Sequence, residues 1–329
     1  MPESAAQPAG AVRLAMERHQ AWIYLAAIAL GLGLGHVAAP LASTLDRLLW
    51  PTLVLLLYVT FTQIKLAELP AAFRDVRFTA AALVGNFLVL PSLLWCVLLL
   101  APDDPVVRLG LVLVLVVPCT DWFITFTHQA HGDTRRAITI TPTLLLAQMV
   151  LLPLYLWLFM GAEFVAIGAS GRMIVAFMAV IVLPLVLAYL TTRWAADQSR
   201  RLHIIDRLGA WPVPLLAVVL MLIAASQVQT VLEARDLFGV VALTCLVFLL
   251  AAAVLAIGMG KLFRLPTAQG RTLLFSMTTR NSFVVLPFAL ALPVHQQMAA
   301  VVIVLQSLVE LLGMLVLLAL VRRRRRATI

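Results

Sequence analysis

Long runs of apolar residues, separated by short polar stretches, dominate the chain from residue 20 to residue 320. A membrane-spanning helix needs about 20 mostly apolar residues, and the sequence contains ten such runs. Because lipid offers the backbone no hydrogen-bond partners, helices are the only spanning form that these lengths allow. The predicted helices are residues 20–38, 47–65, 78–101, 106–131, 134–160, 172–192, 208–228, 236–259, 268–291 and 295–320. The pattern therefore predicts an all-α polytopic membrane protein with about ten transmembrane helices.

The composition supports this prediction. Of the 329 residues, 63% are hydrophobic and 12% are charged, whereas a soluble domain is about 45–50% apolar and about a quarter charged. The net charge of +9 comes from basic residues between the apolar runs, where they face lipid headgroups. We therefore expect membrane lipid and no nucleic acid as a partner. No glycine-rich phosphate loop occurs, so we expect no cofactor and no enzyme activity, but transport of a small inorganic or organic solute.

The distribution of Lys and Arg predicts the orientation of the chain. Of the 24 Lys and Arg residues, 19 lie at the termini and in alternate loops, 4 lie in the other loops, and Arg280 lies within an apolar run. Basic residues collect on the cytoplasmic side of a membrane. We therefore expect a multi-pass protein of the plasma (inner) membrane with both termini in the cytoplasm.

The ten runs divide into two halves of five. We expect a single transmembrane transporter domain, residues 1–329, with an interfacial lead-in at 1–19, a first repeat at 20–160, a second repeat at 172–320 and a basic cytoplasmic tail at 321–329. A repeat with an odd number of helices places its second copy in the membrane with opposite polarity. The predicted architecture is thus a pair of inverted five-helix repeats, as is common in secondary transporters.

The fourth and ninth helices are interrupted by polar residues at corresponding places in the two halves. The interruptions are Pro118–Asp121 and Thr278–Ser282. Discontinuous helices mark a binding site near the midplane, because their unpaired backbone groups need partners. Ordinary proline kinks are the alternative, but they would not require the neighbouring charged residues. We therefore predict that helices 4 and 9 cross at the binding site.

Three charged residues lie far from the predicted loops. Asp121, Arg280 and Glu310 would each cost about 2.5–3.5 kcal/mol at the bilayer centre if unpaired. Asp121 and Arg280 occupy comparable places in the two repeats, which predicts an ion pair, either at the site or as a purely structural link. Glu310 lies near Gln306 and Ser307 on one polar face, and burial disfavours the charged form of a carboxylate, so this residue is suited to bind a proton.

The cysteines and histidines give one further candidate. Cys119 stands beside the break in helix 4, whereas Cys96 and Cys245 have apolar neighbours and are expected to pack as small hydrophobic residues. An odd number of cysteines without paired spacing indicates no zinc site. His128 and His131 have helical spacing, but no third ligand is apparent, so we expect no metal site.

Short motifs carry a resemblance to a known family. They are Asn86-Phe87 with Pro91, Pro118-Cys119-Thr120, Gly132-Asp133, Asn281-Ser282-Phe283 and Leu308-Val309-Glu310. Together with ten helices, they resemble the bile acid/sodium symporter superfamily, and most closely its arsenical-resistance branch of arsenite permeases. The resemblance implies a panel domain and a core domain, a crossing of helices 4 and 9 in the core, and alternating access.

The resemblance also implies roles for individual residues. Cys119 stands at the place of an essential cysteine of the arsenite permeases, and trivalent arsenic is a soft centre that prefers thiolate ligands. Glu310 matches a glutamate of the family's last helix. Helix 9 departs from the pattern, because Phe283 and the two valines after it replace a carboxylate that binds ions in relatives. Arg280, which is always charged, would also repel sodium, so we predict sodium-independent transport.

Three functions follow from these residues. The first is proton-driven efflux of arsenite or antimonite, and the second is transport of a small organic anion that Arg280 grips. The third, a non-transporting receptor, lacks a soluble output domain. The candidate substrate-binding residues are Cys119, Thr120, Asp121, Arg280, Asn281 and Ser282, and the candidate ion-coupling residues are Asp121 and Glu310.

Overall fold

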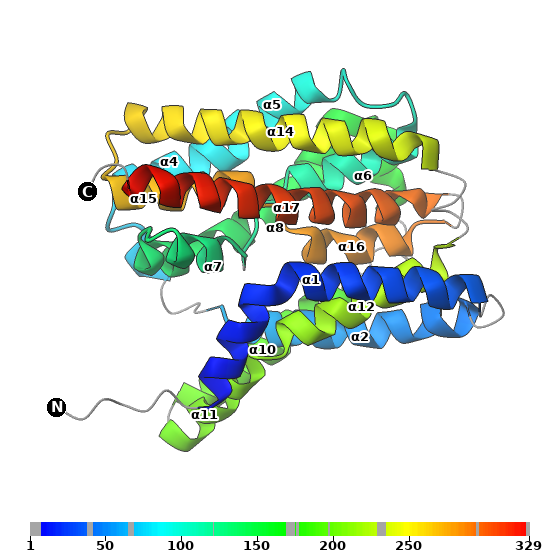
Figure 1. The fold of residues 1–329 in the computed structure, drawn as a ribbon, viewed down its shortest axis with the longest axis horizontal. Helices are drawn as coiled ribbons and strands as arrows, with labels where there is room; N and C mark the ends of the chain where they lie inside the picture. Colours follow the sequence, from blue (N-terminus) through cyan, green and yellow to red (C-terminus); the bar gives the residue numbers. More distant parts are fainter. Residues whose placement is uncertain are drawn as a thin grey trace. The chain divides into compact units, whose positions relative to one another are not determined.

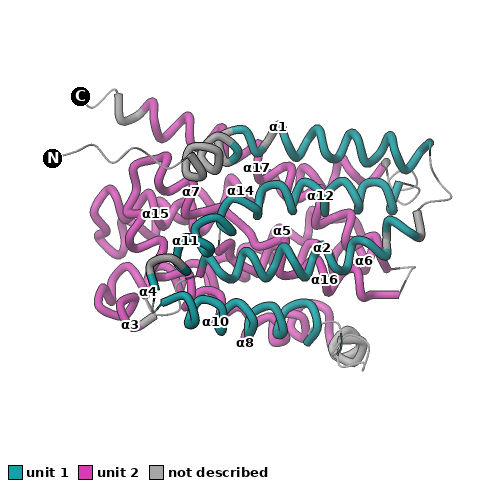
Figure 2. Tube along the Cα trace, turned by 90° about the horizontal axis from the view of Figure 1, so that it is seen from below, with its two compact units in different colours: residues 1–63, 175–233 teal, residues 64–174, 234–329 magenta. Residues whose placement is uncertain are grey.

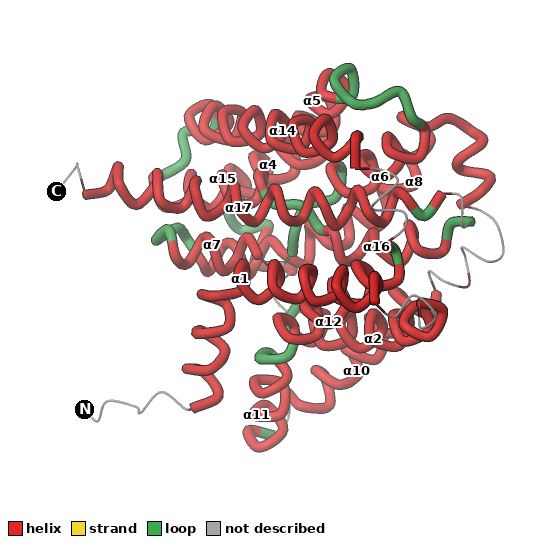
Figure 3. Tube along the Cα trace, turned by 45° about the vertical axis from the view of Figure 1, so that its right-hand side comes forward, coloured by secondary structure: helices red, strands yellow, loops and turns green. Residues whose placement is uncertain are grey.

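The computed structural model consists of helices joined by short loops (Figure 1). It describes residues 8–37, 42–64, 69–120, 122–168, 175, 178–196, 198–228, 235–293 and 296–326. Figure 3 shows helices and loops, and no strand, over these ranges. The chain divides into two compact units, each built from two separate stretches (Figure 2). Unit 1 contains Met1–Gln63 and Val175–Glu233, and unit 2 contains Ile64–Ile174 and Ala234–Ile329.

Unit 1 is built around a close helix pair. Its elements are α1 (Pro8–Val37), α2 (Ala42–Thr62), η4 (Met178–Val182), α10 (Leu183–Ala196), α11 (Ser199–Leu208) and α12 (Pro212–Ser226). Helices α1 and α12 lie side by side (Figure 1). Gly31 and Gly35 lie at their interface, where an added Cβ would overlap the backbone of α12 at Met221 or Ala225. These small residues, four positions apart, allow the two backbones to pack closely.

Unit 2 contains both of the predicted breaks. Its elements are α3 (Leu69–Ala72), α4 (Val76–Val84), η3 (Gly85–Val89), α5 (Leu90–Val97), α6 (Pro105–Leu115), α7 (Trp122–Gln129), α8 (Thr134–Gly168), α14 (Arg235–Leu262), α15 (Thr267–Thr278), α16 (Ser282–Ala291) and α17 (Met298–Arg326). Helix α17 packs against α6, α14 and α16, and α15 packs against α14, α7 and α4. The breaks are therefore surrounded by helices of one unit.

The apolar helices confirm an all-α polytopic membrane protein. Among the described residues, six helices are long and apolar enough to cross a membrane, and they are Val76–Val97, Thr134–Gly161, Met178–Ala196, Arg201–Ser226, Asp236–Leu262 and Met298–Arg323. Shorter apolar helices cover Trp22–Val37, Arg47–Thr62, Pro105–Leu115 and Ser282–Ala291. Together they overlap all the predicted runs, although residues 172–174 and 176–177 of the sixth run lie outside the described residues. The inverted repeat, with boundaries at 20–160 and 172–320, stays a prediction.

The fourth and ninth predicted runs are each divided into two helices. The fourth run is α6 followed by α7, and the ninth is α15 followed by α16. Helix α6 ends at Leu115, close to Pro118, which has no N–H and disfavours a helical residue before it. Thr279 after α15 is extended, and the Asn281 side chain caps α16 by accepting a hydrogen bond from the amide of Val284. The discontinuity predicted for these two helices is therefore present.

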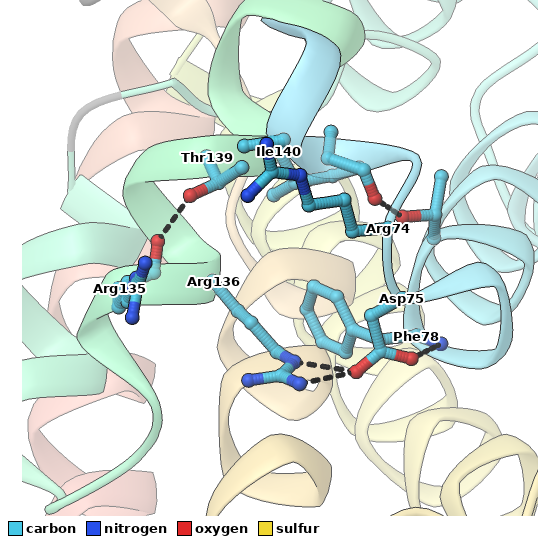
Figure 4. Close-up of a pocket in the computed structure, with 10 residues that line it drawn as sticks. Arg74, Asp75, Phe78, Arg135, Arg136, Thr139 and Ile140 are labelled. Atoms are coloured by element: carbon cyan, nitrogen blue, oxygen red, sulfur yellow. Dashed lines mark hydrogen bonds and ion pairs between the residues drawn. The ribbon is translucent and has the colours of Figure 1, made fainter. Parts of the chain in front are cut away.

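A polar cluster ties together the starts of α4, α8 and α15 in unit 2. Arg136 of α8 forms ion pairs with Asp75 and Asp133, and Gln269 of α15 donates to Asp75 Oδ2 at 3.1 Å. The guanidinium of Arg136 points at the Asp75 carboxylate, whose other oxygen accepts from the amide of Phe78 (Figure 4). Asp75 is thus both the cap of α4 and the link from that helix to α8 and α15.

The ionisation of Asp75 follows from these contacts. Burial acts to raise the pKa of Asp75, but hydrogen bonds from the Phe78 amide, Arg136 and Gln269, together with the Arg136 charge, outweigh it and lower the pKa below 3.8. The cluster therefore favours the charged form of Asp75 in the folded protein.

We expect Asp75→Asn to lower the thermal unfolding midpoint at neutral pH. The cost is about 1 kcal/mol or less, because the two side chains are 34% and 27% exposed. Since the folded-state pKa lies below the unfolded-state value, this stabilisation is present above the ordinary pKa of 3.8 and is lost as the pH falls through the lowered value. Thermal unfolding in detergent should give a lower midpoint for the variant than for the wild type at neutral pH, and this difference in midpoint should disappear at acid pH.

Asp104→Asn is the matched control. Asp104 caps α6 by accepting from two backbone amides, and no ion pair to it occurs in the described residues. Asparagine caps helices about as well as aspartate, so this variant should resemble the wild type. If the unfolding midpoint of Asp75→Asn stayed below that of the wild type at low pH, the charge of the Asp75 carboxylate would not be the source of the stabilisation.

Candidate functional site at the crossing of two interrupted helices

The two breaks in unit 2 are joined through their backbones. Pro118 and Arg280 form an isolated antiparallel β-bridge. The amide of Cys119 donates to the carbonyl of Thr279 at 3.2 Å, and the amide of Asn281 donates to the carbonyl of Val117 at 2.8 Å. These bonds supply partners for backbone groups that a broken helix leaves unsatisfied. The breaks therefore cross as two short extended segments.

Polar side chains from both breaks and from α17 form a buried network beside this crossing. Asn281 Nδ2 donates to Thr120 Oγ1 at 3.2 Å, which links the two breaks a second time. At the start of α16, Ser282 Oγ lies 3.2 Å from Gln306 Oε1 and accepts from Ser307 Oγ at 2.7 Å. The polar face predicted on the last helix therefore points into the crossing.

Glu310 completes this network and is buried, with 2% of its surface exposed. Its Oε2 accepts from Gln306 Nε2 at 2.7 Å and from the backbone amide of Arg280 at 2.9 Å. Its Oε1 has no hydrogen-bond partner among the described residues, and the same holds for Arg280 Nε. Among the described residues, the crossing therefore contains one buried acceptor and one buried donor without a hydrogen-bond partner.

The guanidinium of Arg280 lies in a cradle of four oxygen atoms. Its Nη2 donates to Asn86 Oδ1 at 2.9 Å, to the Ser276 carbonyl at 3.1 Å and to the Met277 carbonyl at 2.8 Å. Its Nη1 donates to the carbonyl of Leu115, the last residue of α6, at 3.4 Å. These four acceptors define what we call the oxygen cradle.

Asn86 is the site residue that the sequence did not reveal. It lies in the π-helical segment η3, a feature often found at functional positions, and its Nδ2 donates to the Ala82 carbonyl and to Ser276 Oγ. Gly85 lets this segment approach α15, because a Cβ there would lie 2.7 Å from Met277 Sδ. In the sequence, Asn86 is marked only as part of the Asn86-Phe87 motif. The one signal of a role in the site is that it is a polar residue within an apolar run.

The cysteines differ from one another in their surroundings. Cys119 is buried in the crossing, and its Sγ accepts a hydrogen bond from the amide of Trp122 at 3.3 Å, at the start of α7. Cys245 is buried in α14, as predicted. Cys96 is exposed, so the prediction that it packs as a small hydrophobic residue is wrong. The run of apolar residues around Cys96 did not reveal which face of the helix turns outward.

The structure brings together most of the predicted site residues. The residues found at the crossing are Cys119, Thr120, Arg280, Asn281, Ser282 and Glu310. Asp121 lies outside the described residues, so its ion pair with Arg280 stays a prediction.

The Gly132-Asp133 motif and the two histidines lie in or just after α7. Asp133 accepts from the amide of Arg136 at the start of α8 and is anchored to Thr272 of α15, so the Gly132-Asp133 motif joins helices. His128 and His131 belong to no cluster of three or more metal-ligating side chains in the described part of the chain.

The fold and the crossing define a class of protein. A multi-pass membrane protein with two interrupted helices that meet at buried polar residues is typical of secondary transporters. A model of the sodium bile acid symporter family matches residues 50–234, which is more than half of the chain. The chain therefore belongs to the sodium bile acid symporter family and is a membrane transporter. No curated protein matches the chain closely enough to narrow this assignment.

We expect Asn86→Leu to destabilise the protein by about 2–3 kcal/mol, because it removes an acceptor from a buried charged group. Ser276→Ala is the control, since it removes only a neutral hydrogen bond to the same asparagine and should cost about 1 kcal/mol. Chemical unfolding of both variants in detergent measures the difference. Equal stability of the two variants would contradict a role for Asn86 in holding the guanidinium.

Proposed function

We propose that this chain exports arsenite or antimonite across the plasma (inner) membrane in exchange for protons, with both termini in the cytoplasm. The observation that carries the proposal is the position of the Cys119 thiol, at the start of the half-helix α7 and inside the crossing. The asymmetry of Lys and Arg supports the orientation.

The thiol of Cys119 suits a trivalent arsenic or antimony centre. Arsenous acid is a neutral trihydroxide near neutral pH, and a thiol can replace one of its hydroxyl groups. An arsenic–sulfur bond then forms, an arsenic–oxygen bond breaks, and the hydroxyl leaves as water with the thiol proton. Backbone amides at a helix start favour the thiolate, and the Trp122 amide already donates to Sγ. A soft thiolate is a far better ligand for this centre than a hydroxyl.

The surroundings of Arg280 favour a neutral solute. Both Nη groups of its guanidinium donate to oxygen atoms of the protein itself. A two-pronged grip on a carboxylate needs two parallel N–H donors, whereas Nε is the one guanidinium nitrogen without a partner among the described residues. Arsenous acid needs no such grip, because its hydroxyl groups can both donate and accept single hydrogen bonds.

Glu310 is the group that we propose carries the proton. Oε1 has no partner among the described residues and is therefore able to take a proton without losing a hydrogen bond. Asp121 is the second candidate, on its place in the sequence alone. The fixed charge of Arg280 at the crossing disfavours a sodium ion there, which supports transport without sodium.

One observation favours a second function, the transport of a small organic anion. Arg280 Nε is buried without a partner among the described residues, so one N–H is open to a carboxylate or sulfonate oxygen. Uptake into everted vesicles of arsenite, antimonite and a panel of small organic anions, with choline in place of sodium, separates the two functions. Accumulation of an organic anion but not of arsenite would favour the second.

We expect Cys119→Ser to abolish arsenite accumulation in these vesicles nearly completely, because a hydroxyl is a hard, weak ligand for arsenic. Cys96→Ser is the matched control, since this thiol is exposed and should be dispensable. Equal amounts of folded protein, checked by detergent-extracted thermal stability, are required for the comparison. Unchanged arsenite export by Cys119→Ser would exclude the thiol mechanism.

We expect Glu310→Gln to flatten the pH dependence of export, because glutamine preserves the shape and hydrogen bonds of Glu310 but cannot titrate. Initial rates measured across a pH series, with and without an imposed proton gradient, test this. Asp103→Asn is the control, because the Asp103 side chain is 95% exposed. An unaltered pH profile in Glu310→Gln would shift the proton to Asp121.

A further inference from the structure

A cavity of about 210 Å³ lies at the starts of α4 and α8 in unit 2 (Figure 4). Three arginines line it, namely Arg74 from the turn between α3 and α4, and Arg135 and Arg136 from the first turn of α8. Pockets for drug-sized molecules begin at about 300 Å³, so this volume suits a smaller, charged group. We call this cavity the arginine pocket.

Two of the three arginines have no acidic partner. Arg136 forms ion pairs with Asp75 and Asp133, the residues at the starts of α4 and α8. The guanidinium groups of Arg74 and Arg135 form no hydrogen bond or ion pair with a described residue, and both residues are exposed. The arginine pocket therefore presents two positive charges that no described carboxylate balances, which favours an anion as its ligand.

The position of the arginine pocket along the helices places it at the membrane surface. Two of the helices that are long enough to span a membrane, Val76–Val97 and Thr134–Gly161, begin at this pocket. Since a span crosses the hydrocarbon core, its end lies at the level of the lipid headgroups. Phe73 and Val76, on either side of Arg74 and Asp75 in the sequence, are exposed. Apolar side chains beside a basic pocket suit a ligand with both a charged head and apolar chains.

The side of the membrane also favours a lipid. Arg74 lies between the second and third predicted spans, and Arg135 between the fourth and fifth. Both positions belong to the set of loops in which Lys and Arg collect, which predicts the cytoplasmic side. The cytoplasmic leaflet is the one that carries anionic lipids, and basic pockets between spanning helices on that side bind their headgroups.

We propose that the arginine pocket binds the phosphate group of an anionic phospholipid, with Arg74 and Arg135 as its ligands. Guanidinium groups bind phosphate oxygens through paired N–H donors, and Phe73 and Val76 contact the acyl chains. Inorganic phosphate offers the same oxygens but no acyl chains. Because the two arginines precede and begin different helices, a bound lipid links α4 to α8 and stabilises unit 2.

Thermal unfolding of the purified protein in mixed micelles tests the lipid. We expect phosphatidylglycerol to raise the unfolding midpoint by several degrees over phosphatidylcholine with the same acyl chains and mole fraction. Sodium phosphate should raise it no more than sodium chloride at equal ionic strength. Equal midpoints in the two lipids would overturn the proposal. A rise in inorganic phosphate as large as that in phosphatidylglycerol would assign the pocket to free phosphate and overturn the lipid.

Two variants test the pocket itself. Arg74→Gln/Arg135→Gln removes the two unbalanced charges, and Ala71→Trp fills the cavity, which Ala71 lines, while every charge remains. Both should lose most of the difference in midpoint between the two lipids. Retention of the full difference by the double variant would overturn the proposal.

Lys261→Gln/Arg207→Gln is the matched control. It also removes two exposed basic residues from loops predicted to be cytoplasmic, and neither residue lines the pocket. This variant should keep the difference in midpoint between the two lipids. An equal loss in the control and in Arg74→Gln/Arg135→Gln would show that general surface charge is responsible, and would overturn the proposal.

Native mass spectrometry of the wild type gives a measurement that needs no variant to fold. From an equimolar mixture of the two lipids, the protein should retain phosphatidylglycerol in preference to phosphatidylcholine, and an absence of preference would overturn the proposal. All these measurements use protein without solute. Their outcome is therefore independent of whether the chain exports arsenite.

Discussion

A buried guanidinium needs hydrogen-bond acceptors, and four oxygen atoms in the interior of unit 2 supply them to the two Nη groups of Arg280. Three of its acceptors are backbone carbonyls that have no partner within their own helix, because α6 and α15 end at these residues or within one turn of them. The fourth, Asn86, comes from a helix that opens into a π-helical segment at that place. The breaks, the π-helical segment and the charge therefore depend on one another, and none of them would be stable in an apolar interior alone.

Helix α15 is held at both of its ends by polar contacts. Near its start, Gln269 and Thr272 bind the cluster of Asp75 and Asp133, and near its end Ser276 joins the cradle. The first cluster is partly exposed, so solvent screens it and its contribution to stability is small. The cradle is buried, and loss of one partner there is much more costly. The position of α15 is consequently set mainly by the crossing.

The chemistry of the crossing divides among three kinds of group. Arg280 supplies a positive charge, Glu310 offers a carboxylate with one oxygen that has no partner among the described residues, and Cys119 offers a thiol at a helix start. A fixed cation and a carboxylic acid in the same site are the basis of the proton coupling proposed above.

The sequence by itself determined the helices and their interruptions. Hydrophobic length and the position of Pro118 act locally along the chain, so the apolar runs, the breaks in the fourth and ninth helices and the inward face of Glu310 were all predicted. The sequence did not reveal which residues meet across helices. Asn86 and Arg280 are 194 positions apart, and nothing in either segment indicates the other. Cys96 was expected to pack as a small hydrophobic residue but is exposed, because an apolar helix does not reveal from its own sequence which face a neighbour will cover. Only tertiary packing decides that, since each partner of a buried polar group is chosen by which helix ends lie within hydrogen-bond distance of it.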